Sequence, residues 1–134
     1  MAALFAGLVF CLSLLWLKQS SLDISWPFFD PLIFLQLALF YPLTEEILFR
    51  GWLQSVFARY PIGCKRWGPI SVANLLTSVV FAVFHLYYHS YLWSLLVIVP
   101  SLVFGYFREK FSGLHPPIIL HIFYNTSYFW LFKP

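Results

Sequence analysis

The sequence predicts an all-α membrane protein, a polytopic helix bundle of about five transmembrane helices. Composition is the first reason. Of the 134 residues, 61% are hydrophobic and only 10% are charged, whereas soluble domains are nearer half apolar and a quarter charged. Aromatic residues make up 22% of the chain, which excludes a disordered protein. The apolar residues also gather in long runs, and crossing a bilayer takes about 20 such residues.

Five apolar runs are the predicted helices, and polar loops separate them. They cover residues 2–17, 31–57, 70–88, 91–107 and 117–132. We interpret the first as a retained membrane helix, because no basic residue precedes it and no clear cleavage site follows. We expect the second run to tilt or to bend at Pro42, and the fourth to bend at Pro100. Residues 1–134 are therefore predicted to form a single integral-membrane domain.

Charged residues are few, and their distribution predicts the environment of the chain. The net charge of +3 is scattered, which excludes a nucleic-acid partner. The loops after the second and fourth runs carry five basic residues, against two on the other side. Because Lys and Arg concentrate on the cytoplasmic side, the sequence predicts a multi-pass cell-membrane protein with a cytoplasmic N-terminus. Cys11 and Cys64 are expected at different depths and not in a disulfide.

The first polar motif within an apolar run comprises Glu45, Glu46 and Arg50. A charge at the bilayer centre costs from about 2.5 to more than 10 kcal/mol, so these side chains are expected to face the protein interior. Glu46 and Arg50 are four residues apart and can form an ion pair. Glu45 points about 100° away from Glu46 and is left as a candidate general base. The alternative is a buried pair that only fixes helix packing.

The second motif comprises Phe81 and His85. Phe81 lies one turn before His85, so its ring is expected beneath the imidazole. The alternative is a histidine that only forms a hydrogen bond between helices. His89 continues the same stripe but lies at the helix end, where we expect it to reach water.

The third motif comprises His121 and Asn125. These residues are four apart and can direct N–H donors into one volume. Two convergent neutral donors in a dry site could form an oxyanion hole. The alternative is a pair of hydrogen bonds between helices, worth about 1 kcal/mol each.

Together the three motifs supply a base, a positioning group and an anion stabiliser for the attack of water on an amide. Other protease chemistries fit less well. Ser78 lies about two turns from His85 on the same helix, which does not make a nucleophile–base pair. Asp23 and Asp30 both lie in the first linker, so an aspartyl mechanism lacks its parts.

The motifs EExxxR, FxxxH and HxxxN, in this order, resemble the CAAX prenyl protease and bacteriocin-processing family (CPBP), also called Abi. The resemblance covers residues 42–125. It implies an intramembrane glutamic endopeptidase that uses no metal or other cofactor. Carried over by position, Glu45 activates water, His85 holds that water, and His121 and Asn125 form the oxyanion hole. The supporting residues are then Glu46, Arg50 and Phe81.

The chain is short and resembles the compact bacterial members of this family. This implies a bacterial inner-membrane location and a protein substrate with a membrane-associated C-terminal tail, met among membrane lipids. One alternative is a zinc peptidase with Glu45, His85 and His121 as ligands, although the HExxH pair is absent. Another is a non-enzymatic immunity or binding protein, or a proton relay through the same residues.

Overall fold

The computed structural model describes residues 23–134, so the predicted first helix and Cys11 lie outside the described residues. In this part of the chain almost all regular structure is helical. Two helices, Pro31–Phe57 and Tyr91–Lys110, are long and apolar enough to cross a membrane, and Val72–His85 is a shorter apolar helix. The all-α class is confirmed, while the count of five spans stays a prediction.

The chain forms two compact units, and the single domain predicted from the sequence stays a prediction. Among the described residues, the first unit contains 23–44 together with Ile118–Pro134, and the second contains Glu45–Pro117. Each unit is described by itself below.

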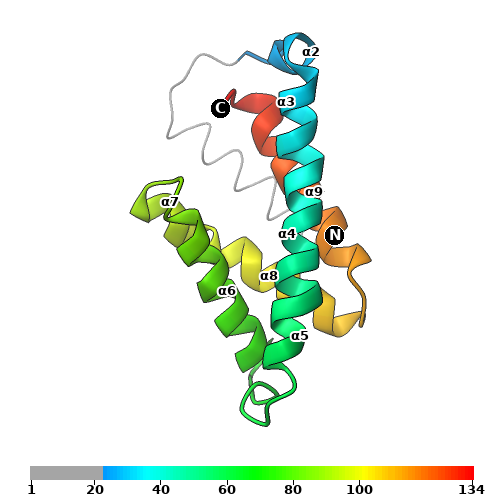
Figure 1. Cartoon of the computed structure of the whole chain (residues 1–134), viewed down its shortest axis with the longest axis vertical. Helices are drawn as coiled ribbons and strands as arrows, with labels where there is room; N and C mark the ends of the chain where they lie inside the picture. Colours follow the sequence, from blue (N-terminus) through cyan, green and yellow to red (C-terminus); the bar gives the residue numbers. More distant parts are fainter. Residues whose placement is uncertain (1–22) are drawn as a thin grey trace. The chain divides into compact units, whose positions relative to one another are not determined.

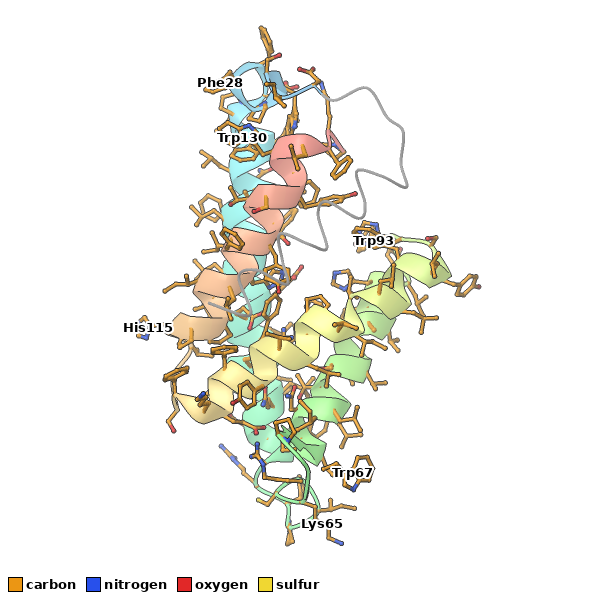
Figure 2. The ribbon with its side chains drawn as sticks, turned by 180° about the vertical axis from the view of Figure 1, so that it is seen from behind. Phe28, Lys65, Trp67, Trp93, His115 and Trp130 are labelled. Carbon is orange, nitrogen blue, oxygen red and sulfur yellow. The ribbon has the colours of Figure 1, made fainter. Side chains whose placement is uncertain are left out.

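In the first unit the N-terminal part of the long helix packs against the C-terminal helix (Figure 1). Its elements are α2 (Trp26–Phe29), α3 (Pro31–Leu35), the π turn η1 (Gln36–Phe40), the start of α4 (Tyr41–Glu46) and most of α9 (His115–Leu131). The buried Trp26 donates its indole N–H to the Phe129 carbonyl at 2.7 Å. Phe28 packs edge-on against Trp130 with ring centroids 5.8 Å apart (Figure 2). These contacts fix α9 against α2.

Helix α9 begins at His115, earlier than the predicted start at residue 117. Pro116 and Pro117 occupy its first turn. Backbone N–H groups at the start of a helix have no partner within the helix, so proline costs nothing there.

The second unit contains three longer helical stretches and one small hairpin. Its elements are the remainder of α4, the π turn η2 (Ile47–Leu53), α5 (Gln54–Phe57), β1 (Arg66–Trp67), β2 (Ile70–Ser71), α6 (Val72–His85), α7 (Tyr91–Leu96) and α8 (Ile98–Lys110). The strands pair antiparallel, Arg66 with Ser71 and Trp67 with Ile70. Figure 2 shows Lys65 and Trp67 at this hairpin, which lies at one end of the unit.

The hairpin corrects the third predicted helix, which was expected to begin at residue 70. Ile70 and Ser71 form a strand, and the helix begins at Val72. The Ser71 hydroxyl accepts the N–H of Asn74 at 3.0 Å, which is the usual cap at a helix N-terminus. The helix also ends earlier than predicted, at His85, and turns follow.

The fourth predicted helix is interrupted at Val97, not at Pro100, and it extends to Lys110. Pro100 still explains the interruption. It has no N–H to donate to the Leu96 carbonyl four residues earlier, and its ring collides with that carbonyl. The proline therefore interrupts the helix about one turn before its own position.

Helices α6 and α8 cross closely at Asn74 and Gly105 (Figure 1). A Cβ atom at Gly105 would lie only 1.9 Å from Asn74 Oδ1. The Asn74 amide also donates to the Leu102 carbonyl at 2.9 Å. Only glycine at position 105 permits this approach.

Candidate active site

The buried ion pair predicted from the first motif is present in the second unit. Arg50 Nη1 lies 2.9 Å from Glu46 Oε1, and both side chains are 0% exposed. Arg50 Nη2 donates to the Ser101 hydroxyl at 2.6 Å and to the Ser101 carbonyl at 3.0 Å. The pair is therefore anchored to α8, which makes its burial tolerable.

Aromatic rings flank the Arg50 guanidinium. Its carbon Cζ lies 4.7 Å from the centroid of the Phe81 ring and 5.4 Å from that of Phe104. A cation above an aromatic face is attracted by the electron density of the ring, and more strongly where water is excluded. Arg50 is thus held by a carboxylate, a serine and two rings from three helices.

Phe81 also supports His85, as the second motif predicts. The two ring centroids are 4.4 Å apart. His85 Nδ1 donates to the Phe81 carbonyl at 2.9 Å, since a carbonyl oxygen can only accept. With the proton of neutral His85 on Nδ1, Nε2 is the acceptor nitrogen. Phe81 therefore links the Glu46–Arg50 pair to the histidine and sets its tautomer.

His89 follows α6 and is exposed, in agreement with its predicted position at the end of the helix. Its ring stacks on that of His85, with centroids 5.8 Å apart and planes 22° apart. Although the side chain is exposed, neighbouring groups remove part of its hydration, and this desolvation lowers the pKa of His89.

The two adjacent glutamates differ in exposure. Glu46 is fully buried, whereas Glu45 and His85 are both of intermediate exposure. Glu45 and His85 are therefore partly exposed at the surface of the described residues, whereas the carboxylate of the ion pair is enclosed.

His121 and Asn125 belong to α9 in the first unit. His121 is buried, with 5% of its surface exposed. Asn125 Nδ2 donates to the Leu37 carbonyl in η1 at 3.0 Å. One N–H of Asn125 thus makes the hydrogen bond between helices foreseen as the alternative for this motif. An amide nitrogen carries two hydrogens, so a second N–H is available for other donation.

The predicted site residues are distributed over both units. The second unit brings together Glu46, Arg50, Phe81 and His85 through the contacts above, and it also contains Glu45. His121 and Asn125 lie in the first unit.

A polar network that the sequence did not predict anchors the long helix to α6 and α8. Gln54 donates to the Gly105 carbonyl at 3.2 Å and to Glu109 at 2.8 Å. Glu109 also accepts from the Ser71 hydroxyl, and it pairs with Arg66 at 3.0 Å. Polar residues at membrane depth are a signal for such bonds, but the identity of each pair depends on tertiary packing.

A zinc peptidase would need three ligands grouped around one ion. Among residues 23–134, no three His, Cys, Asp or Glu side chains are grouped so that they could hold a metal ion.

Comparison with known proteins gave one family. A family model described as "Rce1-like: Type II CAAX prenyl endopeptidase Rce1-like" matches residues 26–127, which is more than half of the chain and includes all three motifs. No curated protein matches, and no solved structure matches.

Proposed function

Since the chain belongs to the Rce1-like family of type II CAAX prenyl endopeptidases, we propose that it is a glutamate-dependent peptidase acting at the membrane. The family makes the chain a membrane endopeptidase. The residues, the mechanism and the substrate given below are our proposal.

Glu45 and His85 activate the attacking water. The difference between the two glutamates supports this assignment: Glu46 is fully buried against Arg50, while Glu45 and His85 are only partly buried. Glu45 accepts a proton from water, and His85 orients that water through Nε2, the nitrogen left as acceptor by its bond to Phe81. Glu46, Arg50 and Phe81 support the site by fixing the helix faces around it.

The water oxygen then bonds to the carbonyl carbon of the scissile peptide. His121 and Asn125 donate to the oxyanion that develops on the carbonyl oxygen. The carbon–nitrogen bond breaks as the intermediate collapses, and Glu45 returns its proton to the departing amine. No cofactor takes part in this scheme.

The proposed substrate is a protein with a membrane-associated C-terminal tail, cleaved in or near that tail. The lipid bilayer positions both molecules. The enzyme is proposed to be a multi-pass protein of a bacterial inner membrane, with its N-terminus in the cytoplasm.

Co-expression with tagged tail-anchored proteins tests the assignment of Glu45. Wild type should shorten a substrate that Glu45→Gln leaves intact, because Gln keeps the shape and hydrogen bonding of Glu but cannot accept the proton. Asp23→Asn is the matched control, since Asp23 is an exposed carboxylate outside all three motifs. Both variants should reach the membrane in equal amounts. Cleavage by Glu45→Gln at the wild-type rate would remove Glu45 from the mechanism.

A further inference from the structure

The long helix Pro31–Phe57 changes its hydrogen-bond register at η1. At the end of η1 the N–H of Tyr41 donates to the Gln36 carbonyl, five residues earlier. The next acceptor in this register is the Leu37 carbonyl, and its donor would be residue 42. Residue 42 is proline and has no N–H. The register of η1 therefore supplies the Leu37 carbonyl with no backbone donor.

Asn125 supplies the missing donor. Its Nδ2 atom lies 3.0 Å from the Leu37 oxygen. Because a carbonyl can only accept, this contact also fixes which end of the amide faces the helix. The Leu37 carbonyl thus orients the whole Asn125 amide.

The second π turn, in the other unit, shares the side-chain contact but has no proline at the corresponding position. At the end of η2 the N–H of Gln54 donates to the Phe49 carbonyl, again five residues earlier. The next carbonyl, that of Arg50, accepts a long hydrogen bond of 3.4 Å from Arg108 Nε on α8. In both turns a side chain on another helix donates a hydrogen bond to a backbone carbonyl. That carbonyl belongs to the residue directly after the one that accepts the backbone bond from five residues later. Residue 55, the next donor in the register of η2, is serine and has an N–H, so the missing backbone donor is a feature of the Leu37 carbonyl and not of the Arg50 carbonyl.

We propose that Pro42 and the Leu37 carbonyl are positioning elements of the active site. Pro42 keeps the Leu37 carbonyl available, and that carbonyl holds the Asn125 amide so that its second N–H can donate elsewhere. A regular α-helix would give the Leu37 carbonyl to the Tyr41 N–H and leave the amide without this anchor. The use of the second N–H rests on the proposed function, while the anchoring itself does not. π turns are rare and often occur at functional sites, which agrees with this assignment.

A double-mutant cycle on the full chain in detergent tests the anchoring. Asn125→Ala should lower the melting temperature by about 2–5 °C, the scale expected for one hydrogen bond between helices. Pro42→Ala provides an N–H that competes for the Leu37 carbonyl. In that background Asn125→Ala should cost less than half as much. Pro100→Ala is the matched control, because it replaces a helix proline of the other unit. In the Pro100→Ala background, Asn125→Ala should lower the melting temperature as much as it does in wild type.

Activity provides the second measurement. Pro42→Ala should lower kcat about tenfold or more, with KM unchanged and a melting temperature at or above that of wild type. A structural role alone would lower the melting temperature together with kcat. If Asn125→Ala lowers the melting temperature equally in the wild-type and Pro42→Ala backgrounds, the anchoring is overturned. An intact coupling with a fully active Asn125→Ala variant instead overturns the oxyanion role of Asn125 and leaves the anchoring standing.

Discussion

His85 and Phe81 are joined by a hydrogen bond of 2.9 Å between an imidazole nitrogen and a backbone carbonyl one turn earlier on α6. This bond uses Nδ1, so the acceptor properties of the neutral ring reside in Nε2. The same residue pair is also in ring contact at 4.4 Å. Tautomer and ring plane are thus both fixed by Phe81.

The tautomer leads to a prediction about two amide substitutions. His85→Asn can keep the bond to Phe81 but has no atom at the position of Nε2, so the cleavage rate should fall about 100-fold or more. His85→Gln places an oxygen near that position and should retain more activity than His85→Asn. Initial rates on one substrate, with melting temperatures as the control for folding, measure the difference. Wild-type activity in His85→Asn would contradict the role of Nε2.

The Glu46–Arg50 pair should be needed for stability. Glu46→Ala leaves a guanidinium with no carboxylate in a fully buried position, which typically costs about 3–5 kcal/mol. Replacing both residues with leucine removes the buried charge and should recover most of that loss. Denaturant titrations of the three proteins in detergent measure these free energies. A Glu46→Ala variant as stable as wild type would exclude a stabilising pair.

The crossing of α6 and α8 should tolerate no side chain at position 105. Gly105→Ala places a Cβ atom 1.9 Å from Asn74 Oδ1, and overpacking of this kind costs about 1–3 kcal/mol. Asn74→Ala in the same chain removes the obstacle and should reduce the penalty. Gly51→Ala is the control, because the nearest atom to its Cβ would be a flexible Leu114 methyl group at 3.3 Å. Equal melting temperatures for both alanine variants would show that the helices can separate without cost.

Peptidase activity should survive excess chelator. The scheme uses only side-chain proton transfer and hydrogen bonding, so dialysis against chelator should leave the rate unchanged. Elemental analysis of the purified protein provides an independent measurement. Stoichiometric, tightly bound zinc, with activity lost on its removal, would favour the zinc peptidase.

Native Cys64 provides a test of orientation. It is exposed in the loop after the long helix, and the distribution of basic residues predicts that this loop faces the cytoplasm. With Cys11→Ser as background, Cys64 in intact cells should resist an impermeant thiol reagent. A Lys133→Cys variant that also carries Cys64→Ser should be labelled. The reverse labelling pattern would show the opposite membrane orientation, with the C-terminus in the cytoplasm.

Contacts within one helix were predictable from the sequence. The Glu46–Arg50 pair and the Phe81–His85 contact both follow from a spacing of four residues, and both are present. The helical class followed from composition. Local spacing is enough in these cases because a regular helix fixes which residues share a face.

Contacts between helices were not predictable in the same way. Ser101, the partner of Arg50 on α8, lies 51 residues later in the sequence. Leu37, the partner of Asn125 in η1, lies 88 residues earlier. Neither π turn has a periodic sequence signal, because an extra residue in a turn changes the register without changing the composition. The hairpin at Ile70 was missed since apolar residues fit a short strand as well as a helix.

The Glu46–Arg50 pair also has an expected consequence for the insertion of the long helix into a membrane during synthesis. Both members lie on one helix and are adjacent after a single turn, so they can neutralise each other as soon as that segment has formed. Ser101 is made 51 residues later and cannot help at that moment. An isolated arginine would oppose insertion of its segment into lipid, whereas a neutralised pair opposes it less. We therefore expect the long helix to enter the membrane with this charge pair already compensated, before α6 and α8 are made and the contacts to Ser101 can form.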